Sequence, residues 1–252
     1  MTIKKYNSKP KKTSLLFKLI VLIIRLFYPK TKFNDVQNIP NEPSIIVSNH
    51  AKTNGPIITQ LSFPVDRYIW CIGEMMSSKE IPKYAYKDFW SKKPKCVRWL
   101  YKILSYIIAP CSFIFKNAYS IGVYKDARIL DTFKQTVIRL NEGNHVIIFP
   151  ECDKKHNEIV NDFQQNFVDV AKLYHKRYNV ILSFTPMYIA PTIKTVTFGK
   201  PIKYNPEISL DIQRGQICEY LKNEITRIAK QLPTHKVVPY ENLPKRKYKN
   251  SK

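Results

Sequence analysis

The chain has 252 residues, a length that favours one large domain with its own core. Lys and Arg number 42 against 19 Asp and Glu, a net charge of +23, so we expect a polyanionic partner: nucleic acid, anionic lipid or a phosphorylated substrate. The five cysteines are scattered and form no CxxC pair, so neither a disulfide framework nor a zinc site is indicated and reduced, cytosolic thiols are expected.

Residues 1–33 predict a basic segment followed by a membrane-associated helix. Lysines at 4, 5, 9, 11 and 12 precede an apolar run over residues 14–28, and no small-residue cleavage site of an export signal follows. Lys18 and Arg25 interrupt the run, so it falls short of the roughly 18 apolar residues of a spanning helix. Their spacing of two turns puts both charges on one helix face, which favours a helix lying in the membrane interface with its cations at the lipid phosphates. The alternative is an amphipathic helix packed on the protein's own core.

Apolar runs and helical spacings alternate along the rest of the chain. Strands are expected at residues 44–48, 68–72, 119–124, 145–149, 180–189 and 195–198. Helices are expected from Pro56 to about residue 61, over 97–108, after a cap at Asp126, over 163–174 and over 210–232. The apolar face of the 97–108 helix indicates either a second membrane contact or core packing. The basic tail from residue 245 is expected to be disordered.

This alternation predicts an α/β fold with a mostly parallel or mixed central sheet flanked by helices. We assign residues 34–240 to this domain and 241–252 to a basic C-terminal tail. In such sheets functional residues gather just beyond the strand ends. His50 and Glu151 both stand there, and a histidine at that place can act as a general base.

Four segments resemble, in order and spacing, the motif blocks of the glycerophospholipid acyltransferase family (lysophosphatidic-acid acyltransferase type, with a PlsC-like domain). The first is 48–56, which contains Asn49 and His50, and the second is 121–126, which contains Lys125. The third is the apolar strand that ends in Phe-Pro-Glu at 149–151, and the fourth is Phe-Thr-Pro-Met-Tyr at 184–188. Phe-Pro-Glu about a hundred residues after Asn-His is the most specific element.

The resemblance implies transfer of a fatty acyl group from acyl-CoA or acyl-carrier protein to a hydroxyl of a glycerol-phosphate or lysophospholipid acceptor. It implies a peripheral enzyme on anionic lipids at the cytoplasmic face of the cell membrane, with neither a metal nor a bound cofactor. His50 would take the hydroxyl proton without a covalent enzyme intermediate. Glu151 would bind the acceptor, and Lys125 and Lys154 would contact its phosphate. The motif positions Asn49, Gly55 and Pro150 complete the predicted substrate site.

The chain departs from the family pattern at several positions. Gly55 stands where the family has the aspartate that orients the catalytic histidine. We expect the adjacent Asn54 to orient the ring in its place, although it carries no charge; the alternative is that Asp153 or another distant acid substitutes for the aspartate. Lys125 and Lys154 stand where arginines are expected, and lysine lacks the bidentate fork. The alternative hypothesis is therefore a catalytically impaired relative that binds acyl-lipids or membranes.

Two further hypotheses concern residues near these motifs. Cys152, which replaces a motif glycine, could act as a thiol nucleophile beside His156, whereas the partners for a metal site are missing. Aromatic and basic residues alternate over 83–102, a mixture that suits single-stranded nucleic acid or the water–lipid boundary. With an apolar N-terminal helix nearby, lipid is the simpler interpretation, and no nucleic-acid partner is expected.

Overall fold

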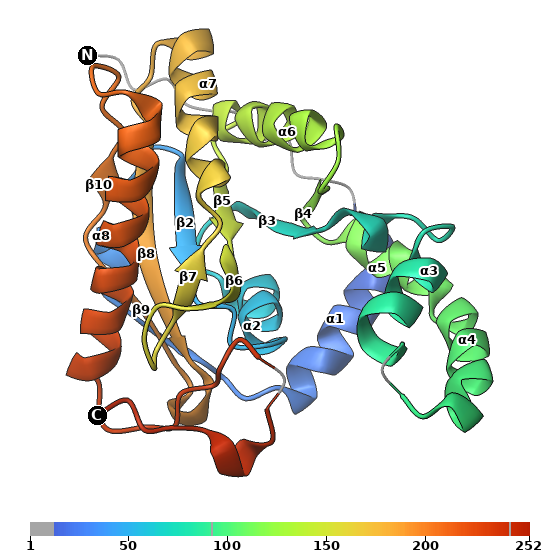
Figure 1. Ribbon diagram of the computed structural model, residues 1–252. Helices are drawn as coiled ribbons and strands as arrows, with labels where there is room; N and C mark the ends of the chain where they lie inside the picture. The colour runs from blue at the N-terminus through green and yellow to red at the C-terminus, as the bar shows by residue number, and fades with distance from the viewer. Residues whose placement is uncertain (1–12, 92, 242) are drawn as a thin grey trace.

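The computed structural model describes residues 13–91, 93–241 and 243–252. Within these residues an eight-stranded sheet forms the centre of the molecule (Figure 1). Its strands are β1 (Lys32–Asn34), β2 (Ser44–Ser48), β3 (Arg67–Ile72), β4 (Ser120–Val123), β5 (His145–Ile148), β8 (Ser183–Ala190), β9 (Thr195–Phe198) and β10 (Ile202–Lys203). A separate hairpin is formed by β6 (Glu151–Lys155) and β7 (Asn161–Phe163).

The strand order is β1-β9-β8-β2-β5-β3-β4, with β10 paired to β8. Strand β2 lies in the middle of this order and runs parallel to both β5 and β8, and all five of its residues are buried. Strands β3 and β4 continue in the same direction, whereas β9 and β10 are antiparallel to β8. This mixed sheet confirms the predicted fold class. It also puts the carboxyl ends of β2, β5, β3 and β4 along one edge, hereafter the carboxyl edge.

Alternate side chains of the buried strands pack into two apolar layers, one on each face of the sheet. Ile45 and Val47 of β2 face helices α6 (Ile129–Asn141), α7 (Asp169–Tyr178) and α8 (Leu210–Gln231). Ile46 faces the other way, toward Ile58 of helix α2 (Asn54–Ser62) and Val238 of the C-terminal segment. Because both faces are covered, the central strands read as continuous apolar runs in the sequence.

A group of helices extends beyond β3 and β4 and is hereafter called the helical lobe (Figure 1). It comprises α1 (Leu15–Phe27), α3 (Ile81–Ala85), α4 (Arg98–Ile107) and α5 (Ser112–Asn117). Ser14 caps α1 by accepting the Phe17 N–H at 3.1 Å, and its own N–H donates to Asn117 of α5. Phe17 is the buried residue of α1. Large apolar side chains are exposed along α1 and α4: Leu15, Leu16, Leu19, Leu22, Ile23, Ile24, Leu26, Phe27, Trp99, Leu100, Ile103, Leu104, Tyr106 and Ile107.

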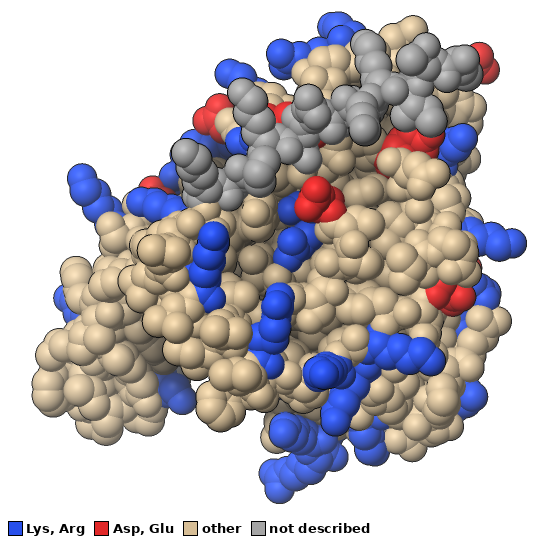
Figure 2. Space-filling model, turned by 180° about the vertical axis from the view of Figure 1, so that it is seen from behind, with Lys and Arg blue, Asp and Glu red and all other residues tan. Residues whose placement is uncertain are grey.

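Seen from behind, the α4 side of the lobe shows mainly residues that carry no charge (Figure 2). Among the described residues, one helical stretch, Lys95–Asn117, is long and apolar enough by length and composition to cross a membrane, and 11% of its most apolar window is buried. The lysines between residues 4 and 12 that motivate the basic N-terminal segment lie outside the described residues.

Three local predictions need correction. Residues 163–174 are not one helix, because Phe163 pairs with Glu151 in the β6–β7 hairpin and α7 begins only at Asp169. Asp126 does not cap α6, which begins at Ile129; it bonds the backbone and guanidinium of Arg128 instead. The tail is not free of structure, since Lys236 bridges to Asn250 and Ser251 is buried.

Candidate active site

Asn49 fixes the chain where it leaves the carboxyl end of β2. Its side chain is 2% exposed, its Nδ2 donates to the Ile189 carbonyl at 3.0 Å, and its Oδ1 accepts the Ile189 N–H at 2.8 Å. Both ends of the amide are therefore bonded to the neighbouring strand β8. These contacts position the next residue, His50, and the predicted contact of Asn49 with substrate remains a prediction.

His50 has its ring held by a backbone carbonyl. Nδ1 makes a short hydrogen bond to the Lys52 carbonyl. Because a carbonyl can only accept, Nδ1 carries the proton and Nε2 keeps its lone pair. Burial lowers the pKa of His50, an effect that this hydrogen bond partly opposes, so the neutral base form is favoured near pH 7.

The loop that presents this carbonyl has an unusual backbone. Ala51 and Lys52 have φ values of 46° and 56°, in the left-handed region that residues with side chains seldom adopt. Such strain persists only where surrounding contacts impose it, and it is frequent at functional sites. On the far side of the loop, the Lys52 ammonium donates to the Leu243 carbonyl at 2.7 Å and lies 5.1 Å from the centre of the Tyr248 ring.

Gly55 leaves no room for the carboxylate that the family pattern has there. A Cβ at this position would lie 2.6 Å from the His50 carbonyl oxygen and 2.8 Å from Cε1 of Phe149. The backbone oxygen is part of the loop itself, since it accepts the Gly55 N–H at 3.2 Å. The glycine is thus required by the close approach of this loop to itself and to Phe149.

Asn54 is predicted from the sequence as the group that orients the His50 ring, but its amide is engaged elsewhere. Its Oδ1 accepts the Tyr28 hydroxyl at 2.8 Å, and its Nδ2 donates to the Ala51 carbonyl at 3.0 Å. The Lys52 carbonyl performs the orientation instead. Asn54 therefore supports the loop and ties it to the residue that ends α1.

Glu151 joins the third motif to the first. It is 4% exposed; its Oε2 accepts the His50 N–H at 2.5 Å and its Oε1 accepts the Asn161 N–H at 2.9 Å. Burial raises the pKa of this carboxyl to about 7, although both N–H donors act in the opposite direction. These contacts describe a clamp on the His50 backbone, and acceptor binding by Glu151 remains a prediction.

Aromatic residues from distant parts of the chain surround the imidazole. The Phe149 ring centre lies 5.3 Å from that of His50, and the Tyr240 ring meets it edge-on at 6.0 Å. Tyr28, Tyr240 and Tyr248 were not among the residues that the sequence pattern singles out. Tyr28 and Tyr240 lie outside every motif segment and Tyr248 stands in the basic tail, so the motif spacing does not indicate that these tyrosines reach the site.

Of the remaining predicted site residues, Pro150 lies between Phe149 and Glu151, which both contact His50, whereas no contact joins Lys125 or Lys154 to His50 among the described residues. Lys125 follows edge strand β4, three strands from β2, or roughly 14 Å along the carboxyl edge. Lys154 has an 80% exposed side chain whose Nζ lies 3.9 Å from Asp162. Pro150 is buried and its carbonyl accepts the Gln164 N–H at 2.9 Å.

Among the described residues, no base is hydrogen-bonded to the Cys152 thiol, as the thiol hypothesis requires. The Nε2 of His156 lies 4.0 Å from Oε1 of Glu219 on α8, whereas Cys152 is half-buried with its carbonyl bonded to Asn161. Asp153 is exposed and, within the part of the chain that the structure describes, makes no hydrogen bond to the His50 ring. Among the described residues, no three His, Cys, Asp or Glu side chains are grouped so as to hold a metal ion.

The fold is similar to a solved acyltransferase structure. No family model matches the chain. Over 86% of this chain and 81% of the other, it superposes on the crystal structure of the 1-acyl-sn-glycerophosphate (LPA) acyltransferase, PlsC, from Thermotoga maritima, with a TM-score of 0.50 and 15% sequence identity. A stretch of 102 residues, 40% of this chain, is 24% identical to the DExH-box ATP-dependent RNA helicase DExH8 of Arabidopsis thaliana but spans only 10% of that protein. The similarity that extends over most of the chain is therefore one of fold, to a PlsC acyltransferase.

Proposed function

We propose that this chain is an acyltransferase that moves a fatty acyl group from acyl-CoA or acyl-carrier protein to a hydroxyl of a glycerol-phosphate or lysophospholipid acceptor. The observation that carries the proposal is His50 at the carboxyl edge, with Nδ1 bonded to the Lys52 carbonyl and Nε2 left as a base. The PlsC-like fold and the order of the motif segments support the same reaction class. No metal or bound cofactor is required by this chemistry.

In the proposed reaction, Nε2 of His50 removes the proton of the acceptor hydroxyl as its oxygen attacks the thioester carbonyl. The tetrahedral intermediate collapses to an ester and expels the thiolate, which takes the proton back from the imidazolium. The Lys52 carbonyl stabilises the imidazolium through the Nδ1–H bond during this cycle. Replacement of the triad aspartate by an uncharged amide in a serine protease costs about 10⁴-fold in turnover, so a carbonyl dipole is expected to support slower transfer than a carboxylate.

The exposed surface of the helical lobe supports the proposal that the protein lies on a membrane. The exposed apolar side chains of α1 and α4 are more numerous than water-facing helices normally carry, and the chain has a net charge of +23. We place the lobe in anionic lipid at the cytoplasmic face, with the carboxyl edge reached by acyl donors from water. Lys125 and Lys154 are the proposed contacts for the acceptor phosphate, beside Glu151 and the loop residues Asn49, Gly55 and Pro150.

A catalytically impaired relative that binds acyl-lipids is the second candidate. It is favoured by one observation: Gly55 excludes the motif carboxylate, and the described residues bond no acid to the His50 ring. This candidate shares the membrane position and differs only in turnover.

The test is thiol release from acyl-CoA and acyl-carrier donors, with lysophospholipid or glycerol-phosphate acceptors in anionic vesicles. We expect acceptor-dependent release that falls about 10²- to 10⁴-fold in His50→Ala. His156→Ala, which alters a half-buried histidine on the β6–β7 hairpin, is the matched control and should retain full activity. Because burial lowers the pKa of His50, activity should be lost only below about pH 6.5, where the imidazole becomes protonated. No release with any donor, while vesicle binding is intact, would favour the lipid-binding candidate.

A further inference from the structure

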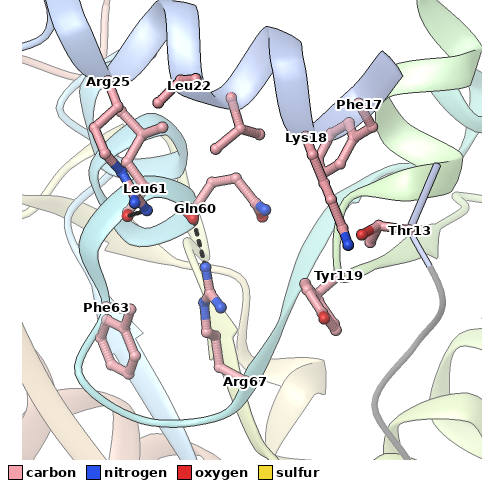
Figure 3. Close-up of a pocket in the computed structure, with 11 residues that line it drawn as sticks. Thr13, Phe17, Lys18, Leu22, Arg25, Gln60, Leu61, Phe63, Arg67 and Tyr119 are labelled. Carbon is pink, nitrogen blue, oxygen red and sulfur yellow. Dashed lines mark hydrogen bonds between the residues drawn. The ribbon is translucent and has the colours of Figure 1, made fainter. Parts of the chain in front are cut away.

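A cavity of about 450 Å³ lies between α1 and the segment that joins α2 to β3. Figure 3 shows Lys18 and Arg25 pointing down from α1 into this space, while Arg67 rises from the opposite wall. The cavity is also lined by Leu22, which lies one turn from each of the two α1 cations, and by the Tyr119 ring. Three cations from two separate segments therefore line the same cavity.

Both arginines are held in place by backbone carbonyls. Arg67 donates from Nε to the Thr59 carbonyl at 3.0 Å and from Nη2 to the Gln60 carbonyl at 2.6 Å, and its guanidinium lies 5.6 Å from the Tyr119 ring centre. Arg25 donates from Nη2 to the Leu61 carbonyl at 2.5 Å. The guanidinium groups are thus fixed by the C-terminal turn of α2.

The cations of this cavity form no ion pair with an acidic side chain among the described residues. None of the ion pairs among the described residues includes Lys18, Arg25 or Arg67. Burial lowers the pKa of Arg67, and the nearby Arg25 acts in the same direction, with Asp66 and Tyr119 opposing. Two guanidiniums that repel each other in a partly closed space gain most from an anion bound between them.

We propose that this cavity binds the phosphate of an anionic membrane phospholipid. Lipid is favoured over free phosphate because Leu22 lines the cavity and the outer side of α1 exposes Leu19, Ile23 and Leu26, so acyl chains have an apolar surface beside the phosphate. The site is separate from the acceptor site. Arg67 begins β3 at the amino edge of the sheet, whereas His50 follows the opposite end of the parallel strand β2. The inference rests on the membrane position of α1 in the proposed function but not on the chemistry at His50.

The test titrates methyl-labelled protein with dihexanoyl phosphatidylglycerol below its micelle concentration and follows leucine methyl resonances. Leu22 and Leu61 line the cavity, whereas Leu130 is exposed on α6 and serves as the internal reference. We expect saturable shifts at Leu22 and Leu61 and none at Leu130. The double variant Lys18→Gln with Arg25→Gln should bind at least about tenfold more weakly. Lys30→Gln, an exposed cation just beyond α1 that does not line the cavity, should change the affinity less than about twofold.

Absence of shifts at Leu22 and Leu61, or equal affinity of the double variant and the wild type, would overturn the proposal. Saturation of the same shifts by inorganic phosphate at equal concentration would identify a free-phosphate site and overturn the lipid assignment. Both altered side chains are exposed, and an unchanged spectrum away from the cavity shows that the double variant is folded. The titration involves no turnover, so its outcome is independent of whether acyl transfer is detected.

Discussion

The loop at residues 49–55 and the helical lobe differ in what their side chains contact. In the loop, the polar groups of Asn49, His50 and Asn54 are bonded to backbone or to neighbouring side chains of the same chain. In the lobe, apolar side chains such as Trp99 and Ile107 remain 65% and 66% exposed. Burying apolar surface is the main favourable term in folding, so exposed surface of this kind indicates contact with something other than water.

This difference shows which region owes its geometry to contacts within the protein. The loop is determined by internal contacts, and a change there should alter folding and turnover together. The lobe surface takes little part in the fold, so changes there should alter binding and leave folding intact. His50→Ala is measured by turnover; three further changes test this contrast in decreasing order of their effect on folding stability.

The largest effect is expected from Gly55→Asp, which restores the family's carboxylate. The new Cβ would lie under 3 Å from the His50 carbonyl oxygen and Phe149, so we expect the free energy of unfolding to fall by about 3 kcal/mol. Turnover should fall as well, because the loop that holds the imidazole must shift. Gly55→Ala carries the same Cβ without the charge and should lose similar stability. Higher turnover in Gly55→Asp would show that the Lys52 carbonyl is a poor substitute for a carboxylate that the loop can accommodate.

Glu151→Gln should have an intermediate effect, because one amide oxygen can replace only one of two acceptors. We expect a loss of about 2 kcal/mol at pH 7, measured by urea unfolding. The folded-state pKa of Glu151 is raised from 4.5 to about 7, so its contribution to stability is fully present below pH 4.5 and decreases as the pH rises to about 7. The stability difference between wild type and Glu151→Gln should therefore shrink over this window. A difference that grows with pH would mean that the two N–H donors outweigh burial and lower the pKa.

The smallest effect on folding is expected from Trp99, Ile103 and Ile107 changed together to Gln. These side chains lie on one face of α4 and are at least half exposed, so the free energy of unfolding should change by less than about 0.5 kcal/mol. Affinity for anionic vesicles should nevertheless fall at least about tenfold, since each buried side chain of this size contributes about 1.5–3 kcal/mol. Leu130→Gln, equally exposed but on α6, is the control. Substantial unfolding of the triple variant would assign this face to the protein's own packing.

The sequence predicts the buried parts of the molecule better than the parts that surround the site. Strands such as β2 and β5 are recognisable because both sheet faces are covered, which leaves uninterrupted apolar runs. The β6–β7 hairpin was missed because β6, at 151–155, is largely polar and exposed. Phe163 fits a helical spacing with Phe167 and Val170, yet strand pairing with Glu151 determines its conformation.

The position of His50 beyond β2 could be predicted from the sequence, but the partners of the ring could not. The orienting group is a backbone carbonyl at Lys52, which every residue type possesses, so no side-chain pattern indicates it. The left-handed conformation of Ala51 and Lys52 is imposed by surrounding contacts and not by glycine or asparagine in the sequence. Tyr28 and Tyr240 reach the site through the tertiary fold alone.

The bond between the Lys52 ammonium and the Leu243 carbonyl joins residues 191 positions apart. The loop that carries the imidazole is therefore closed by a part of the chain that lies beyond every motif segment. A fragment cut to the motif segments alone, residues 48–188, would keep His50, Lys52 and Glu151 but would lack this closure and the Tyr240 ring. The motifs identify where the chemistry is placed, whereas the geometry of the site is a property of nearly the whole polypeptide.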